Sequence, residues 1–338
     1  MNVKSSPILV LGAGSWGTAL SLQLARNGNQ VLLWDFALLH IRKLKQEKAN
    51  QQYLPGIFFP DNIVCIEELT EGIDRLKGFP VQDILIVVPS HAFESLLMSL
   101  KPLLNPESRL LWATKGLTQK GEFLSDAFEG ILGSHYPYGV ISGPSFATEV
   151  AQGLPTSVSL ATTNHAFTSD LFIRFHGHGF QVYSTEDIMG VELGGAVKNV
   201  IAIAVGMFEG LGYGSNARSA LITRGLAELM GLSEKLGALP KTLMGLSGLG
   251  DLVLTCTDNQ SRNRRFGLAI GLGQDPVSAE KSIGQVVEGK GNAALVLQLA
   301  KKYEINLPIC NLIYQVLYQK VSPNEAVKRF IHLPPAIE

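Results

Sequence analysis

The stretch Ile8-Leu9-Val10-Leu11-Gly12-Ala13-Gly14-Ser15-Trp16-Gly17 decides the fold of this 338-residue chain. Its first four residues form a continuous apolar run, which is typical of a strand buried on both faces. Helical character follows until Gly28, and a second apolar run then leads from Val31 to Trp34 and ends at Asp35. The sequence therefore predicts a strand–helix–strand unit with a glycine-rich turn at its first junction.

The spacing of Gly12, Gly14 and Gly17 is by itself a weak signal, because the chain contains 35 glycines. Looser copies begin at Gly212 and Gly289, but neither follows a clear strand or has an acid at the right distance. The copy at Gly12 has both, which favours dinucleotide binding over a purely structural turn. Gly12 would make the tight turn, Gly14 would let backbone N–H groups reach the pyrophosphate, and Gly17 would allow close helix packing.

Further strand-like runs follow in the first half, and several of them end at polar residues. Helical stretches intervene, so the pattern predicts a Rossmann-type α/β fold with a doubly wound, mostly parallel sheet. Ligands bind beyond the carboxyl ends of such strands, where Lys115, Gly143 and Ser145 fall. For Lys115, a solvated loop cation is the alternative. The runs lie at 84–88, 109–114, 138–141, 157–161 and 180–183.

After Tyr183 the strand-like runs stop and helical patterns take over. We therefore expect a dinucleotide-binding domain over residues 1–186 and an all-helical second domain, carrying substrate-binding and catalytic groups, over residues 187–338. The helical patterns lie at 188–208, 218–236, 262–272, 292–303 and 309–319.

One of these helical segments contains an unusual lysine, Lys198, within the apolar run 191–200. Burying an ammonium group is unfavourable unless the group is paired or its pKa shifts. Gly194 and Gly195 lie one turn earlier on the same face, which predicts a bare patch where a flat ring can approach the amine. The alternative is a surface lysine whose stem covers the helix.

Two polar groups of the second half are further candidates. Asp251 follows the glycine-rich turn 247–250, where it either serves a site or caps the next element. Ser261-Arg262-Asn263-Arg264-Arg265 predicts a helix that starts at Ser261 with three arginines in or beside its first turn. The helix dipole disfavours cations there, so the pattern indicates a bound anion such as phosphate, with a solvated basic face as the alternative.

The composition excludes several classes of protein. Hydrophobic residues make up 46% of the chain and charged residues 17%, as in a well-packed protein. The net charge of −1 gives no reason to expect nucleic acid or acidic membranes as partners. Three scattered cysteines fit reduced thiols, and we expect no signal peptide, no membrane insertion, no metal site and a cytoplasmic location.

Taken together, the motifs closely resemble those of the bacterial NAD(P)-dependent glycerol-3-phosphate dehydrogenases. The resemblance runs in order from residue 8 to about residue 330. It rests on Gly12-Ala13-Gly14-Ser15-Trp16-Gly17-Thr18, Ala113-Thr114-Lys115-Gly116, Ser142-Gly143-Pro144-Ser145-Phe146-Ala147, Gly195-Ala196-Val197-Lys198-Asn199, Gly248-Leu249-Gly250-Asp251 and Ser261-Arg262-Asn263-Arg264-Arg265-Phe266-Gly267.

The resemblance implies reversible hydride transfer between NAD(P)H and dihydroxyacetone phosphate, which gives sn-glycerol 3-phosphate for phospholipid synthesis, and it implies a homodimer. Lys198 matches the catalytic lysine of the family, and Lys115 and Asp251 would assist it. The implied cofactor contacts are Ser15, Trp16, Lys115, Ala147, Arg262, Val286 and Glu288. The implied substrate contacts are Lys115, Gly143, Ser145, Lys198, Asp251, Ser261, Arg262 and Asn263.

The chain departs from the family where the choice between NAD and NADP is made. Family members often have an arginine two residues after the tryptophan that ends the second strand, but here the run is Trp34-Asp35-Phe36. Asp35 would accept a hydrogen bond from the ribose hydroxyl and repel a 2′-phosphate, which favours NAD. Arg42, Lys43 or Lys45 would have to compensate for NADP to bind well.

The expected mechanism places the nicotinamide over Gly194 and Gly195, with the substrate carbon between the ring and Lys198. Lys198 would act as general acid in ketone reduction and as general base in alcohol oxidation. Lys115 would lower the pKa of Lys198 by like-charge repulsion, and Asp251 would orient the amine. Two alternatives stay open: a β-hydroxyacid or ketopantoate type of reductase, and a non-catalytic dinucleotide sensor.

Overall fold

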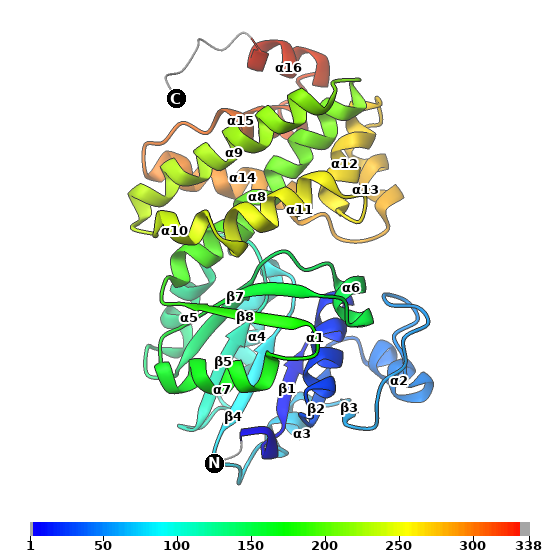
Figure 1. Ribbon diagram of the computed structural model, residues 1–338, viewed down its shortest axis with the longest axis vertical. Helices are drawn as coiled ribbons and strands as arrows, with labels where there is room; N and C mark the ends of the chain where they lie inside the picture. The colour runs from blue at the N-terminus through cyan, green and yellow to red at the C-terminus, as the bar shows by residue number, and fades with distance from the viewer. Residues whose placement is uncertain (1–2, 332–338) are drawn as a thin grey trace.

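The computed structural model describes residues 3–331 and has two parts stacked along its long axis (Figure 1). A sheet flanked by helices forms the lower part of the view, and a layer of helices forms the upper part. The sheet has eight strands and is mostly parallel, and the elements after it are helical. The fold class predicted from the sequence is therefore confirmed.

The sheet is ordered so that the glycine-rich turn lies at its switch point. The strand order is β3-β2-β1-β4-β5-β6-β7-β8. Every neighbouring pair is parallel except β6 and β7, so the chain leaves β1 to build outward on one side and returns to build on the other. The strands are β1 (Ile8–Leu11), β2 (Val31–Trp34), β3 (Ile63–Ile66), β4 (Gln82–Ile86), β5 (Ser108–Trp112), β6 (Tyr138–Ser142), β7 (Thr156–Thr162) and β8 (Phe180–Thr185).

Strand β1 shows why its apolar run is continuous. Ile8 and Val10 belong to the hydrophobic core on one face of the sheet, whereas Leu9 and Leu11 belong to the core on the other. Successive side chains of a strand point to opposite faces, so a strand covered on both sides needs apolar residues at every position. The covering helices are α1 (Ser15–Arg26), α2 (Leu38–Glu47), α3 (Leu69–Asp74), α4 (Ser90–Leu100), α5 (Leu124–Leu132), α6 (Ala147–Gln152) and α7 (His165–Phe175), with a short 3₁₀ helix, η1 (Val3–Ser5), before β1.

The second part is organised around its first helix, α8 (Ile188–Gly210), which runs from the sheet into the helical layer (Figure 1). Its residues from Gly190 to Phe208 are all buried, because other helices surround it. These are α9 (Ser215–Leu236), α10 (Pro240–Leu243), the π-helical turn η2 (Leu246–Gly250), α11 (Asp251–Thr257), α12 (Arg262–Gly271), α13 (Pro276–Ile283), α14 (Glu288–Lys302), α15 (Pro308–Tyr318) and α16 (Pro323–Ile331).

Among residues 3–331, one helix is long and apolar enough to cross a membrane by length and composition alone. Helix α8 has 23 residues, and its apolar 18-residue window has a mean hydropathy of 1.6, so it passes that test. However, 89% of the apolar window is buried inside the protein, as in the central helix of a folded core. A helix that is apolar on all sides is the pattern of a buried core helix as well as of a membrane span.

Glycines let α8 and α12 pack backbone to backbone. A Cβ atom added at Gly206 would lie 1.9 Å from the carbonyl oxygen of Arg264, and one added at Gly267 would lie 2.0 Å from that of Ile203. No side chain fits at either position. The close contact holds the start of α12 against the middle of α8, where Lys198 lies.

A buried carboxylate joins α8 to the sheet. Glu192 Oε1 accepts hydrogen bonds from Trp112 Nε1 at 3.0 Å and from the Ser125 backbone N–H at 3.2 Å, and Glu192 Oε2 accepts one from Ser125 Oγ at 2.6 Å. None of these donors is a cation. Burial therefore raises the pKa of Glu192 to about 7, although the hydrogen bonds oppose the shift.

Candidate active site

The glycine-rich turn has the geometry that the sequence predicts. Gly12 has φ +111°, and a Cβ there would lie 2.5 Å from the carbonyl oxygen of Val87. A Cβ at Gly17 would lie 1.8 Å from the carbonyl oxygen of Gly12, so α1 packs directly on the turn. Nothing lies within 4 Å of a Cβ at Gly14. The start of α1 is therefore open to a ligand, with its first N–H groups available for a phosphate.

Three side chains hold the turn from behind. Asp35 Oδ2 accepts a hydrogen bond from the Ala13 N–H at 2.8 Å, and Asp35 Oδ1 accepts one from the Ala37 N–H at 3.0 Å. Asn50 Nδ2 donates to the Ala13 carbonyl at 2.9 Å, and His40 Nε2 lies 3.1 Å from the same oxygen. Asp35 thus fixes the turn as well as placing a negative charge at the end of β2.

The three cations that could compensate for Asp35 are already paired. Arg42 and Lys45 contact Glu67 at 2.8 and 3.2 Å, and Lys43 contacts Glu47 at 3.8 Å. Phe36 is 86% exposed and offers no charge.

A cavity of about 490 Å³ opens between the turn and the helical part. Trp16 borders it, and its Nε1 is buried without a hydrogen-bond partner in the described part of the chain. An orphaned donor beside an open helix start fits a bound dinucleotide. The predicted residues that border this cavity are Gly14, Ser15, Trp16, Gly17, Lys115, Ser145, Ala147, Lys198, Asp251, Ser261, Arg262, Asn263 and Glu288.

Four predicted residues lie outside this lining. Gly12 and Asp35 shape the turn from behind. Gly143 has φ +153°, and its carbonyl oxygen accepts hydrogen bonds from Ser145 Oγ at 2.9 Å and Lys115 Nζ at 3.4 Å. Val286 is half exposed and borders an adjoining cavity of about 320 Å³, which shares Glu288 with the first.

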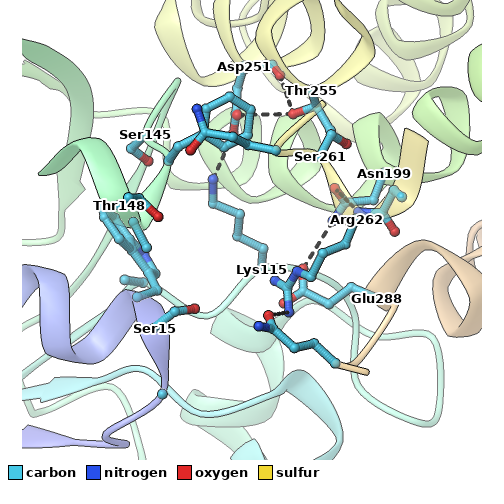
Figure 2. A pocket seen from close by; sticks show the side chains of 18 of the residues that line it. Ser15, Lys115, Ser145, Thr148, Asn199, Asp251, Thr255, Ser261, Arg262 and Glu288 are labelled. Carbon is cyan, nitrogen blue, oxygen red and sulfur yellow. Dashed lines mark hydrogen bonds and ion pairs between the residues drawn. The ribbon is translucent and has the colours of Figure 1, made fainter. Parts of the chain in front are cut away.

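Two lysines share one buried carboxylate at the centre of the cavity. Asp251 Oδ1 lies 2.5 Å from Lys198 Nζ, and Asp251 Oδ2 lies 2.7 Å from Lys115 Nζ. Figure 2 shows Lys115 reaching from the loop after β5 to Asp251, which belongs to the helical part. Lys198 Nζ also donates to Thr255 Oγ1 at 3.1 Å, and Thr255 Oγ1 donates to the Asp251 carbonyl at 2.6 Å.

This arrangement changes the proton affinities of the cluster. Burial lowers the pKa of Lys198 to about 8, and the nearby Lys115 charge adds to the decrease, whereas Asp251 opposes it. Burial, and not like-charge repulsion, is therefore the main cause. Burial would raise the pKa of Asp251, but the two lysines together lower it, so Asp251 stays ionised. A lysine with a pKa near 8 can donate or accept a proton close to neutral pH.

The predicted bare patch at Gly194 and Gly195 is wrong. A Cβ at Gly194 would lie 2.2 Å from the backbone oxygen of Ser247, because η2 packs directly against α8 there. A Cβ at Gly195 would lie 3.4 Å from Ser142 Oγ and 3.5 Å from Lys115 Cγ. Both glycines are buried, so neither can carry a nicotinamide ring. The smallness of Gly194 instead lets η2 bring Asp251, the next residue, beside Lys198.

The predicted helix start at Ser261 is confirmed, because Ser261 Oγ accepts a hydrogen bond from the Arg264 N–H at 3.2 Å. Only two of the three arginines face the cavity. Arg262 and Arg265 border it, whereas Arg264 turns away and contacts Glu209 at 2.7 Å.

Sequence reasoning missed several side chains of the cavity, and two of them, Thr255 and Asn199, contact predicted site residues. Asn263 Nδ2 donates to Asn199 Oδ1 at 2.9 Å, and Asn199 Nδ2 donates to Glu288 Oε2 at 3.1 Å. Asn263 Oδ1 accepts the Gly289 N–H at 2.9 Å, so the amide of Asn263 holds neighbouring elements together. The sequence features that could have identified them are the position of Asn199 directly after Lys198 and that of Thr255 one helical turn after Asp251.

The two parts of the chain also meet at the edge of the cavity. Gln260 Nε2, in the loop before α12, donates to Glu149 Oε1 of α6 at 2.8 Å. Among residues 3–331, no group of three histidine, cysteine or acidic side chains could hold a metal ion.

A Rossmann-type sheet, an open dinucleotide turn and a buried lysine–aspartate cluster together define an NAD(P)-dependent dehydrogenase. Two family models match the chain: the N-terminus of NAD-dependent glycerol-3-phosphate dehydrogenase over residues 7–168, and its C-terminus over residues 187–328. The chain therefore belongs to the NAD-dependent glycerol-3-phosphate dehydrogenase family.

Individual relatives agree with this family. The chain is 52% identical over 330 residues to the glycerol-3-phosphate dehydrogenase [NAD(P)+] of Shewanella baltica, which covers 97% of this chain and 96% of the relative. It is 51% identical to that of Escherichia coli, over 96% of this chain and 95% of the relative. The crystal structure of glycerol-3-phosphate dehydrogenase from Coxiella burnetii matches with a TM-score of 0.93 and 48% identity, over 97% of this chain and 99% of that chain.

Proposed function

We propose that this chain reduces dihydroxyacetone phosphate to sn-glycerol 3-phosphate with NAD(P)H, and catalyses the reverse oxidation. The observation that carries the proposal is the shared carboxylate of Asp251, which holds Lys198 and Lys115 in one cavity with the start of α12. Bound NAD(P)H supplies the hydride. The start of α1 would hold its diphosphate, because Gly14 leaves space there and Trp16 Nε1 has no hydrogen-bond partner in the described part of the chain.

Lys198 acts as the general acid. Its ammonium group donates a proton to the substrate oxygen as the carbonyl is reduced, and its neutral amine removes that proton in the oxidation. Asp251 stays ionised and fixes the amine through the 2.5 Å contact. Lys115, on the other oxygen of Asp251, places a second positive charge beside the developing alkoxide. Arg262 and Ser261 hold the phosphate at the start of α12.

A spectrophotometric assay of the purified protein tests the proposal. We expect NADH oxidation that depends on dihydroxyacetone phosphate. Activity on an unphosphorylated 2-keto acid with none on dihydroxyacetone phosphate would instead select a different reductase, and cofactor binding without turnover would select a sensor.

We further propose that NAD is used in preference to NADP. The negative charge of Asp35 and the pairing of Arg42, Lys43 and Lys45 with glutamates support this preference. NADH should have a kcat/KM at least about tenfold above that of NADPH, since an unpaired charge repulsion of this kind is worth about 1–2 kcal/mol. Phe36→Arg should lower the ratio of kcat/KM for NADH to kcat/KM for NADPH. Equal kcat/KM values for the two cofactors in the unaltered protein would contradict the preference.

The remaining expectations complete the proposal. We place the division between the dinucleotide-binding and helical domains at residues 186 and 187, between the end of β8 at Thr185 and the start of α8 at Ile188. The product would serve phospholipid synthesis, and the enzyme would work in the cytoplasm as a homodimer. Size-exclusion chromatography with light scattering tests the dimer.

A further inference from the structure

The start of α12 carries more positive charge than its internal contacts use. Arg264 forms an ion pair with Glu209 at 2.7 Å, and its side chain is 12% exposed. Arg262 makes one long hydrogen bond, from Nη1 to Gln285 Oε1 at 3.5 Å. Arg265 is exposed and borders the active-site cavity, and its side chain has no hydrogen bond or ion pair within residues 3–331.

The position of Arg265 directs its side chain to the same place as Arg262. The two residues are three positions apart, so they lie on one face of α12. Long side chains in a helix lean toward its N-terminus, which brings the Arg265 guanidinium back toward the first turn. That turn contains no acid, and the helix dipole there disfavours a cation.

Neither of the carboxylates that border the cavity, Asp251 and Glu288, contacts the side chain of Arg265. Asp251 contacts Lys115 and Lys198, and Glu288 accepts a hydrogen bond from Asn199. Two guanidinium groups and the first N–H groups of a helix therefore border one cavity, and within residues 3–331 no carboxylate pairs with either guanidinium. A phosphate monoester, with a charge near −2 and three terminal oxygens, matches this set.

We propose that Arg265 is a second phosphate-binding residue, which holds the phosphate monoester of the substrate together with Arg262. The assignment rests on the proposed function, because it takes the substrate to be dihydroxyacetone phosphate. The cofactor diphosphate would bind at a different part of the cavity lining, the start of α1. Arg265 thus serves the selection of a phosphorylated ketone over an unphosphorylated one.

The test compares Arg265→Gln and Arg265→Lys with Lys235→Gln, which removes an exposed charge elsewhere in the helical part. In Arg265→Gln, KM for dihydroxyacetone phosphate should rise about tenfold, as expected for one charge-assisted contact at a partly solvated site. The inhibition constant of inorganic phosphate, competing with this substrate, should rise by a similar factor. The kcat value and KM for NADH should stay within about twofold, because Arg265 takes no part in proton or hydride transfer.

The KM of Arg265→Lys for dihydroxyacetone phosphate should lie between the values of the unaltered protein and of Arg265→Gln. Lysine keeps the charge but loses the bidentate geometry of the guanidinium group. Circular dichroism and the melting temperature establish that each variant is folded. An unchanged KM for dihydroxyacetone phosphate in Arg265→Gln would overturn the proposal. So would a rise in KM for NADH alone, because Arg265 would then serve the cofactor. If the unaltered protein does not reduce dihydroxyacetone phosphate at all, the proposed function fails instead.

Discussion

The turn after β1 and the lysine–aspartate cluster of the helical part meet at one cavity but are built in opposite ways. The turn works through the absence of side chains: Gly12 and Gly17 let backbone segments touch, and Gly14 leaves room for a ligand. The cluster works through side chains, because Lys198 and Lys115 share the buried carboxylate of Asp251. Added bulk should therefore damage the first region, and removed charge should damage the second.

The largest effect should come from removing the amine of the cluster. Lys198→Ala should lower kcat by about 10²–10⁴, the usual contribution of general acid–base catalysis. Binding of NADH, measured by fluorescence titration, should survive because the turn is untouched. Near-normal turnover in this variant would show that Lys198 is not the general acid. It would also contradict the claim that the cluster acts through its charged side chains.

The unaltered enzyme should show the same amine in its pH dependence. With the pKa of Lys198 lowered to about 8 by burial, kcat/KM for ketone reduction should fall as pH rises through that value. The oxidation, which needs the neutral amine, should rise over the same range. Profiles that move together would contradict a single group acting in both directions.

The contact that Glu192 makes between α8 and the sheet should make the stability of the protein depend on pH. The pKa of Glu192 is raised from 4.5 to about 7, so the folded state binds the proton more tightly than the unfolded state. The stability that this provides is complete below pH 4.5 and is lost as pH rises through 7, by about 3 kcal/mol in total.

Glu192→Gln cannot titrate, so the free energy of unfolding of this variant should exceed that of the unaltered protein at pH 9 but not at pH 5. Urea unfolding at both pH values measures the difference. A gap between the two proteins that does not change with pH would show that Glu192 does not titrate in this range.

The smallest effects should separate two glycines of the turn. Gly17→Ala places a Cβ 1.8 Å from a backbone oxygen. Such overpacking costs about 1–3 kcal/mol of stability, so the melting temperature should fall, and the affinity for NADH should fall as well because the turn must shift to relieve the clash. Gly14→Ala meets no protein atom within 4 Å, so it should weaken NADH binding and leave the melting temperature unchanged. Equal melting temperatures for the two variants would refute the steric distinction.

The two regions also differ in how well the sequence predicts them. The strand, turn, helix and second strand follow from local rules of spacing and burial, and the structure has them as predicted. Strand β3 was missed although Ile63–Ile66 is apolar and is followed directly by Glu67 and Glu68, because no glycine-rich turn follows the run.

In the helical part, local patterns located Lys198, Asp251 and Ser261 but not their surroundings. Whether Gly194 faces a ligand or the backbone of Ser247 depends on how η2 packs, which no local pattern encodes. The direction of Arg264 likewise depends on Glu209, which is remote in sequence. Long-range packing, not propensity, decided these points.

Helix α8 has a consequence for how the enzyme can change over time. Glu192 fixes the start of α8 to the sheet, and Lys198 lies further along the same helix. The number of residues between them therefore sets the direction in which the Lys198 side chain points around the helix axis. Inserting a single residue there would rotate everything beyond it by about 100° and swing the amine away from Asp251. Insertions and deletions should therefore be tolerated in the connecting loops. Between Glu192 and Lys198 they should abolish activity, whichever residue is inserted or deleted.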